Sequence, residues 1–213
     1  MTRLAVLSHR EIAHELGNLG SWVEERNWSL CRVYREDSPA LPDADALVVL
    51  GSPTSVAEGF CAAPAEQEIE WVRQWRGSDR PYLGICFGAQ VLARAEGGSV
   101  RRMERTHRIF SAFDDVCEPT LDGRWAVWHE DAISAPNGAE LLARLPHADA
   151  AFRIGSAWGV QPHIEFTADI VERLGRKFAV EEAKWRSLWE ALRDSEDDHR
   201  RRAHDLLDRV FRT

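Results

Sequence analysis

The sequence predicts an α/β fold: a doubly wound, mostly parallel sheet flanked by helices. Short apolar runs alternate with segments of helical periodicity through the first half of the chain. The runs are apolar throughout, which is typical of strands buried on both faces. They end at serine, glycine or proline, residues that favour turns. Strands and helices in this alternation predict parallel pairing through crossover helices.

Four strands are expected in this first half. Leu4 to Leu7 is short and apolar, and Ser29 to Tyr34 is rich in strand-favouring residues. Asp45 to Leu50 is the clearest run, and residues 81–85 form the fourth. The intervening segments have apolar residues spaced three or four apart, which predicts helices over 11–26, 65–76 and 88–95.

The pattern changes after Gly97-Gly98. Val100 to Cys117 and Trp125 to Trp128 predict shorter strands, which form a smaller, partly antiparallel extension. Gly159 to His163 predicts a last strand that runs into a loop.

The C-terminal segment, from about residue 168, is helical in pattern and highly charged. Its run Ser195 to Arg202 is expected to be a solvated face or a connector. Because no linker interrupts the sequence, residues 1–213 are expected to form a single domain.

The composition narrows the class of protein. The 213 residues include 35 acidic and 27 basic side chains, giving a formal net charge of −8, which argues against a nucleic-acid partner. No apolar stretch approaches the ~20 residues that a membrane span needs. The apolar N-terminal run is too short for a signal peptide. We therefore expect a protein without a nucleic-acid or membrane partner.

The cysteines indicate a reducing compartment. Four are present, widely separated, and no pair has the spacing of a metal site. With no export signal, reduced thiols in the cytoplasm are expected rather than disulfides. The sequence gives no sign of a metal or another cofactor. The four are Cys31, Cys61, Cys86 and Cys117.

The segment Gly84-Ile85-Cys86-Phe87-Gly88 is the most informative part of the chain. It follows an apolar run and opens into helix-favouring residues, which predicts a strand, a sharp turn and a helix with Cys86 at the apex. Flanking glycines permit a tight backbone there, and a helix N-terminus favours the thiolate. We expect Cys86 to be a nucleophile. The alternative is a structural turn with a small buried thiol.

A cysteine nucleophile needs a base, and the base needs an acceptor that orients it. In an extended segment His163 and Glu165 point to the same side, so they form a candidate imidazole–carboxylate pair. The alternative is a surface histidine and a surface glutamate at the end of a strand.

Acyl transfer also needs donors for an oxyanion. One candidate is the backbone N–H of Phe87, directly after the cysteine. The loop Gly51-Ser52-Pro53 is a candidate for the second, and because proline has no N–H, Ser52 or Gly51 must supply it. Gln90 lies one helical turn after the cysteine and either places an amide beside the thiol or faces solvent.

Taken together and in this order, the motifs resemble those of the class I glutamine amidotransferase family. That family carries a G-G-P loop, then G-x-C-x-G-x-Q, then Q-x-H-x-E. The counterparts are Gly51–Pro53, Gly84–Gln90 and Gln161–Glu165. The segment Trp128–Asp131 also resembles the W-H-x-D stretch of stand-alone members similar to the amidotransferase domain of GMP synthase. The resemblance covers roughly residues 1–170.

The resemblance implies the flavodoxin-like class I amidotransferase fold and a reaction. Cys86 would attack the side-chain amide of glutamine, forming a γ-glutamyl thioester and releasing ammonia. His163 would act as acid and base, and Glu165 would orient it. The backbone N–H groups of Phe87 and Ser52 would bind the oxyanion, Gly51 and Gln90 would line the glutamine pocket, and His129 and Asp131 would support its edge or have a structural role.

No nucleotide-binding loop is present, so an ammonia-accepting synthetase would have to be a separate subunit. The chain also departs from the family pattern. Ser52 replaces a loop glycine, Pro162 precedes the histidine, and residues 106–110 replace a glycine–tryptophan pair near the glutamine site. These departures leave two alternatives: a hydrolase of γ-glutamyl peptides or amines with the same triad, and a catalytically degenerate binding or regulatory subunit.

Overall fold

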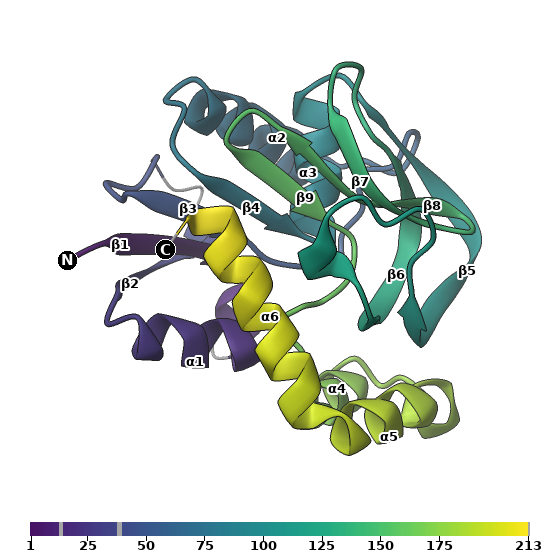
Figure 1. Cartoon of the computed structure of the whole chain (residues 1–213). Helices are drawn as coiled ribbons and strands as arrows, with labels where there is room; N and C mark the ends of the chain where they lie inside the picture. The colour runs from purple at the N-terminus through teal and green to yellow at the C-terminus, as the bar shows by residue number, and fades with distance from the viewer. Residues whose placement is uncertain (13–14, 38–39, 213) are drawn as a thin grey trace.

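The computed structural model describes residues 1–12, 15–37 and 40–212. Seven strands form the main sheet, in the order β2-β1-β3-β4-β9-β8-β7 (Figure 1). The first five of these are mutually parallel, as the sequence predicts, whereas β8 pairs antiparallel with β9 and β7 pairs antiparallel with β8. The strands are β1 Arg3–Ser8, β2 Ser29–Tyr34, β3 Ala46–Val49, β4 Tyr82–Ile85, β7 Glu140–Leu145, β8 Ala148–Ile154 and β9 Ala157–Val160.

Helices cover both faces of this sheet. Because side chains alternate along a strand, Leu4 and Val6 of β1 belong to one buried cluster, and Ala5 and Leu7 belong to the other. The first cluster includes residues of α1 and α6, and the second includes residues of α2 and α3, which lie behind the sheet in Figure 1. These helices are α1 Gly17–Glu25, α2 Ala63–Arg76, α3 Phe87–Ala95 and α6 Glu196–Phe211.

The smaller extension is a two-stranded antiparallel sheet of β5 (Ser99–Ala112) and β6 (Arg124–Ser134). The expected extension is therefore confirmed, but β6 is longer than expected and β5 ends before Cys117. Helices α4 (Ala168–Lys177) and α5 (Arg186–Asp194) share a buried cluster with Phe110 and Ala126 of this sheet. The C-terminal helices begin at residue 168, as expected.

One expectation about local structure was wrong, and one feature was not predicted. The helix expected over 11–26 is shorter: α1 begins at Gly17 after a 3₁₀ turn at Arg10–Ile12, and residues 13 and 14 lie outside the described residues. The hairpin of β7 and β8 was not predicted. Its leucines, alanines and arginines favour helices, and the strands form through pairing of β8 with β9 and of β7 with β8.

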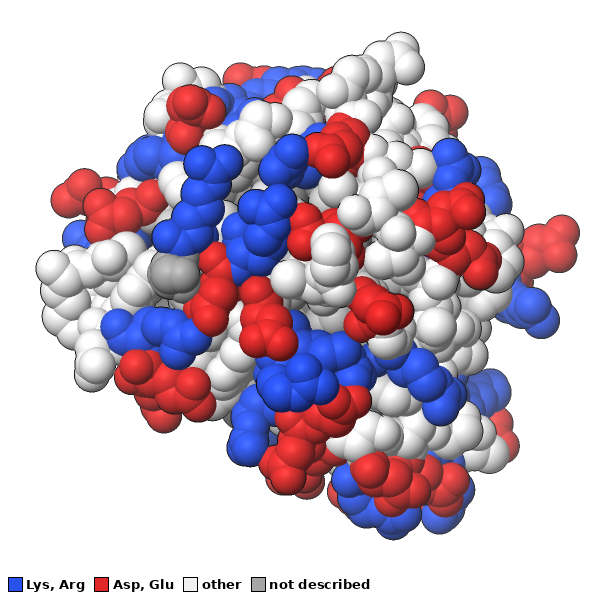
Figure 2. Space-filling model, in the orientation of Figure 1, with Lys and Arg blue, Asp and Glu red and all other residues white. Residues whose placement is uncertain are grey.

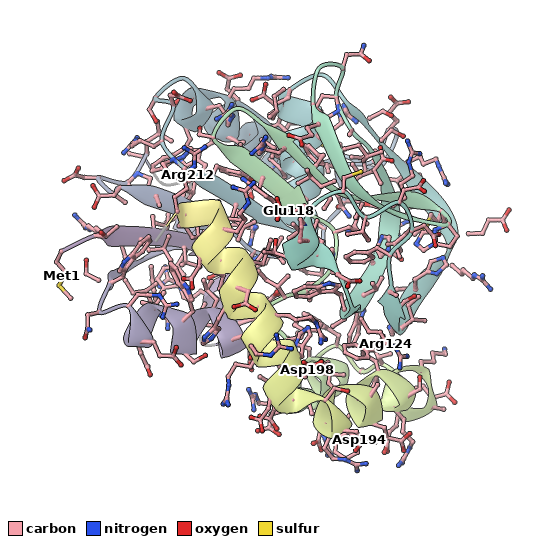
Figure 3. The ribbon with its side chains drawn as sticks, viewed as in Figure 1. Met1, Glu118, Arg124, Asp194, Asp198 and Arg212 are labelled. Carbon is pink, nitrogen blue, oxygen red and sulfur yellow. The ribbon has the colours of Figure 1, made fainter. Side chains whose placement is uncertain are left out.

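Helix α6 crosses the first face of the sheet and ties distant elements together. Arg209 donates to Glu118 at 3.0 Å, and Arg202 donates to the carbonyl of Arg124 at 2.7 Å; Glu118 and Arg124 lie on the same side of this helix in Figure 3. On the other side, Trp22 of α1 donates to Asp208 at 2.7 Å. Of the charged run 195–202, expected to be a solvated face or a connector, residues 196–202 form the first two turns of α6, and His199 among them is buried.

Acidic and basic side chains are interspersed over the face seen in Figure 2. Several form pairs one helical turn apart, such as Arg176 and Glu172 at 2.6 Å, each worth about 0.3–0.5 kcal/mol. Among the described residues, none of the helices has both the length and the apolar character that crossing a bilayer requires.

The junction of β4 and α3 has no room for side chains at its two glycines. A Cβ on Gly84 would lie 2.4 Å from the carbonyl of Gly88, and a Cβ on Gly88 would lie 2.1 Å from the carbonyl oxygen of Val49. Because these neighbours are backbone atoms, rotating a side chain cannot relieve the clash. The two glycines therefore let α3 pack directly against β3 and β4.

Replacing Gly88 by alanine should force α3 away from β3 and lower the free energy of unfolding by about 3 kcal/mol. The matched control is Gly77→Ala at the exposed end of α2, where the backbone is helical (φ −60°); it should change stability by less than about 0.5 kcal/mol. Urea denaturation measures both. Equal stability of the two variants would contradict this packing.

Candidate active site

Cys86 lies at the carboxyl end of β4, directly before α3. Its backbone has φ 53° and ψ −107°, a left-handed conformation that residues with a Cβ rarely adopt. The backbone N–H of Cys86 donates to Val160 at 2.8 Å, and its thiol faces the carbonyl of Trp128 at 3.7 Å. The expected strand, turn and helix are therefore present, with the cysteine at the apex.

The segment 161–166 leaves the sheet beside this turn because β9 is the parallel neighbour of β4. The backbone N–H of Gln161 still donates to Ala150 at 2.7 Å, so Pro162 falls beyond the strand pairing and removes no donor from it. His163 then docks on β6, donating its N–H to Ala126 at 2.8 Å. Residues far apart in sequence are thus brought to one edge of the sheet.

His163 and Glu165 form a buried pair, with Nδ1 2.6 Å from Oε1. Their side chains are only 8% and 4% exposed, which removes the alternative of a surface pair. Burial lowers the pKa of His163, but the Glu165 carboxylate and then the Cys86 sulfur raise it, and the net pKa is about 10. The protonated imidazole therefore lies beside the sulfur of Cys86.

Asn18 of α1 fixes this loop in place. Its side-chain amide donates to the carbonyls of Ile164 at 3.0 Å and Phe166 at 3.1 Å, and its backbone N–H donates to Glu165 at 3.1 Å. The Phe166 ring stacks on the His163 imidazole with centroids 3.9 Å apart. These contacts restrict the orientation of the imidazole.

The loop after β3 approaches the same histidine. A Cβ on Gly51 would lie 2.9 Å from Cε1 of His163, so a larger residue would displace the ring. The φ of Ser52 is not positive, so its backbone is not strained. Its hydroxyl lies 2.8 Å from Nε2 of His9. Buried Arg35 donates to the carbonyls of Leu50 at 2.6 Å and Gly51 at 3.2 Å.

Gln90 is buried rather than solvent-facing. Its amide donates to the carbonyl of Asp131 at 3.3 Å and lies 3.5 Å from Oε1 of Gln161. Asp131 in turn accepts from Ser55 at 2.5 Å, and burial raises the pKa of its carboxyl group. Gln90 therefore links α3 to β6 at the edge of the site.

His129 belongs to a second group of buried rings. Its Nδ1 lies 2.7 Å from the carbonyl of Asp131 and its Nε2 lies 3.2 Å from Nε2 of His147. Burial lowers the pKa of His129 to about 3 and that of His147 to about 4, so both rings are neutral at pH 7. In the part of the chain that the structure describes, no group of three or more His, Cys, Asp or Glu side chains is placed to hold a metal ion.

A cavity of about 290 Å³ opens over these groups. Cys86, His163 and Gln90 line it, together with the loop Gly51–Thr54. Phe87 begins α3, so its N–H has no partner within the helix. The remaining lining residues are Ile12, Glu15, Leu50, Thr106, Arg108, Trp128, His129, Glu130, Asp131, Phe166, Leu174, Phe178 and Val180.

Fold and site together define an α/β protein with a cysteine at a strand–helix turn, facing a buried histidine–glutamate pair. Comparison with protein families agrees: the model of the glutamine amidotransferase class-I family matches residues 8–170. The chain belongs to the class I glutamine amidotransferase family.

Two kinds of known protein are similar to this chain: glutamine-hydrolysing GMP synthases and solved structures named as glutamine amidotransferases. The chain is 35% identical to the glutamine-hydrolysing GMP synthase of Porphyromonas gingivalis over 156 residues, 67% of this chain but 29% of that protein. Among solved structures, a glutamine amidotransferase from Thermotoga maritima superposes with a TM-score of 0.85 at 25% identity, covering 100% of this chain and 99% of that one. A glutamine amidotransferase from Methylobacillus flagellatus shares the fold, with a TM-score of 0.80 at 19% identity, covering 99% and 94% of the two chains.

Sequence reasoning missed three residues at the site: Asn18 and Arg35, which hold its loops, and Arg108, which lines its cavity. None belongs to a motif. Asn18 and Arg35 act through backbone carbonyls, which leave no signature in the sequence. Arg108 falls within residues 106–110, where the chain departs from the family pattern. That departure was the one feature of the sequence that could have pointed to Arg108.

The His163–Glu165 pair makes stability depend on pH. The folded-state pKa of about 10 lies above the 6.5 of a free imidazole. The stabilisation is therefore complete below about pH 6.5 and is lost as the pH rises through about 10.

Replacing Glu165 by glutamine should lower the pKa of His163 markedly, because the carboxylate that favours the charged ring is gone. NMR titration of the imidazole Cε1 protons measures this. At about pH 8 His163 should be protonated in the wild-type protein and neutral in the variant. His129 is the internal control, neutral in both proteins. A wild-type His163 that titrates near 6.5 would contradict the ion pair.

Proposed function

We propose that the protein hydrolyses the side-chain amide of glutamine, with Cys86 as the nucleophile. The observation that supports this best is the shared cavity: Cys86 and His163 line the same 290 Å³ space, and buried Glu165 lies 2.6 Å from the imidazole of His163. A thiol, an acid–base group and an orienting carboxylate are the parts that acyl transfer through cysteine requires.

In the first step the Cys86 sulfur attacks the amide carbon of glutamine. The developing oxyanion is bound by the backbone N–H groups of Phe87 and Ser52. His163 donates its proton to the leaving nitrogen, the C–N bond breaks and ammonia departs, leaving a γ-glutamyl thioester on Cys86. Glu165 holds the imidazole in position throughout.

In the second step water attacks the thioester and His163, now neutral, accepts a proton from it. The C–S bond breaks and glutamate leaves, which restores the charged pair. Gly51 and Gln90 shape the pocket for the glutamyl chain. Arg35 supports the oxyanion loop, since it contacts the carbonyls of Leu50 and Gly51.

The ammonia is delivered to a separate synthetase subunit in this proposal. The GMP synthases that resemble the chain are glutamine-hydrolysing enzymes, and the chain spans only 29% of the first of them. No cofactor is needed for the hydrolysis, and residues 1–213 act as one domain.

Replacing Cys86 by alanine should lower the rate of ammonia release from glutamine at least about 10⁴-fold, because the nucleophile is lost. The matched control is Cys117→Ala, which removes an exposed free thiol outside the cavity and should keep the wild-type rate. A coupled ammonia assay measures all three proteins, with and without candidate synthetases.

Activity that survives in Cys86→Ala would remove this thiol from the nucleophile role. A wild-type protein that neither releases ammonia nor reacts at Cys86 with an electrophilic glutamine analogue would favour the degenerate binding subunit.

A further inference from the structure

Arg108 presents a cation to the cavity. It lies on β5, opposite Trp128 of β6, and its guanidinium lies over the Trp128 ring at 5.0 Å. Among the described residues it forms no salt bridge, and its buried Nε has no hydrogen-bond partner. Burial lowers the pKa of Arg108, and the neighbouring carboxylate of Glu130 is already paired with Arg102. A half-buried cation of this kind is stabilised by an anionic ligand.

The lining of the cavity has two chemically different parts, called here its polar and apolar halves. The polar half contains Gln90, Glu130 and Asp131, whose amide and carboxyl oxygens can accept hydrogen bonds from the ammonium group of a glutamyl substrate. The apolar half contains Ile12, Trp128, Phe166, Leu174 and Val180, which belong to one hydrophobic cluster, and Phe178. Glu15 also reaches this half, but Arg173 pairs with both of its oxygens at 2.8 and 2.7 Å.

Arg108 belongs to the apolar half. It lies on Trp128, Trp128 meets Phe166 edge to face at 6.4 Å, and Phe166 stacks on His163. In the proposed mechanism His163 gives its proton to the leaving nitrogen. The leaving group therefore departs on the side of His163 and Phe166. Ammonia has no apolar part that could pack against the apolar half of the cavity and no anionic group that could pair with Arg108.

We propose that the site also hydrolyses γ-glutamyl amino acids whose second residue is apolar. This rests on the proposed function, because it keeps the same nucleophile and acid. The carboxylate of the leaving amino acid pairs with Arg108, and its side chain packs against Leu174 and Phe178. Both of these residues follow position 170, where the match to the family ends.

The chemistry balances without another reactant. The sulfur of Cys86 forms a bond to the γ-carbonyl carbon, His163 protonates the amide nitrogen, and the C–N bond breaks to release the free amino acid. Water then cleaves the thioester and glutamate is released. The sum is one γ-glutamyl amino acid and one water giving glutamate and one amino acid.

The test is a matched pair of substrates: γ-glutamyl-leucine and γ-glutamyl-isopentylamide, whose leaving groups differ only by the carboxylate. Wild-type kcat/KM should favour γ-glutamyl-leucine by about 30-fold, the usual effect of a charged hydrogen bond. In Arg108→Gln this ratio should fall to near one, and Arg108→Lys should restore part of it. Arg105→Gln, an exposed arginine of the same strand outside the cavity, should keep the wild-type ratio.

A ratio that is unchanged in Arg108→Gln overturns the inference, as does wild-type protein that hydrolyses glutamine but not γ-glutamyl-leucine. If no substrate is hydrolysed, the proposed function fails. The affinity for γ-glutamyl-leucine then tests whether Arg108 binds the carboxylate. Calorimetry on Cys86→Ser should show γ-glutamyl-leucine bound about 30-fold more tightly than in the double variant with Arg108→Gln. Equal affinities would overturn the inference independently of the chemistry.

Discussion

The close packing of α3 on β3 and β4 determines where the Cys86 sulfur lies. Glycine at positions 84 and 88 lets the helix begin directly at the end of β4, and the cost is a left-handed backbone at Cys86 of about 1–3 kcal/mol. Core contacts on both sides of the sheet hold that conformation. The parallel neighbour β9 then delivers His163 to the same edge, so the thiol and the imidazole meet because of strand order rather than proximity in sequence.

The charge at this edge is maintained by burial and by contacts from remote elements. A buried imidazolium is unfavourable alone, and Glu165 offsets that cost at 2.6 Å. Asn18 from α1 and Arg35 from the end of β2 hold the two loops through their backbone carbonyls. Helix α6 closes over α1 and reaches η3 (Pro119–Leu121) and β6. Elements that contribute no reacting group therefore determine the geometry of the site.

Much of this arrangement could be predicted from the sequence, for physical reasons. The elbow at Cys86 and the strand Ser29–Tyr34 have strong local signals: glycines at a tight turn, and residues that favour strands. The hairpin of β7 and β8 could not be predicted, because its residues favour helices and the strands form through pairing of β8 with β9 and of β7 with β8. The roles of Asn18 and Arg35 could not be predicted either, since their side chains donate hydrogen bonds to backbone carbonyls of segments distant in sequence. Arg108 differs, because the role proposed for it depends on its forming no salt bridge with any residue that the structure describes, and only the folded structure shows which charges surround a cation.

The account depends on Cys86 forming a bond to the substrate while His163 serves the departing nitrogen. Rapid acid quenching of wild-type protein during turnover of isotopically labelled glutamine, followed by peptide mass analysis, tests this most directly. A labelled glutamyl group on the peptide that contains Cys86, and on no other, is the predicted result. Turnover with no such adduct, or with the label attached to a different side chain, would contradict the account.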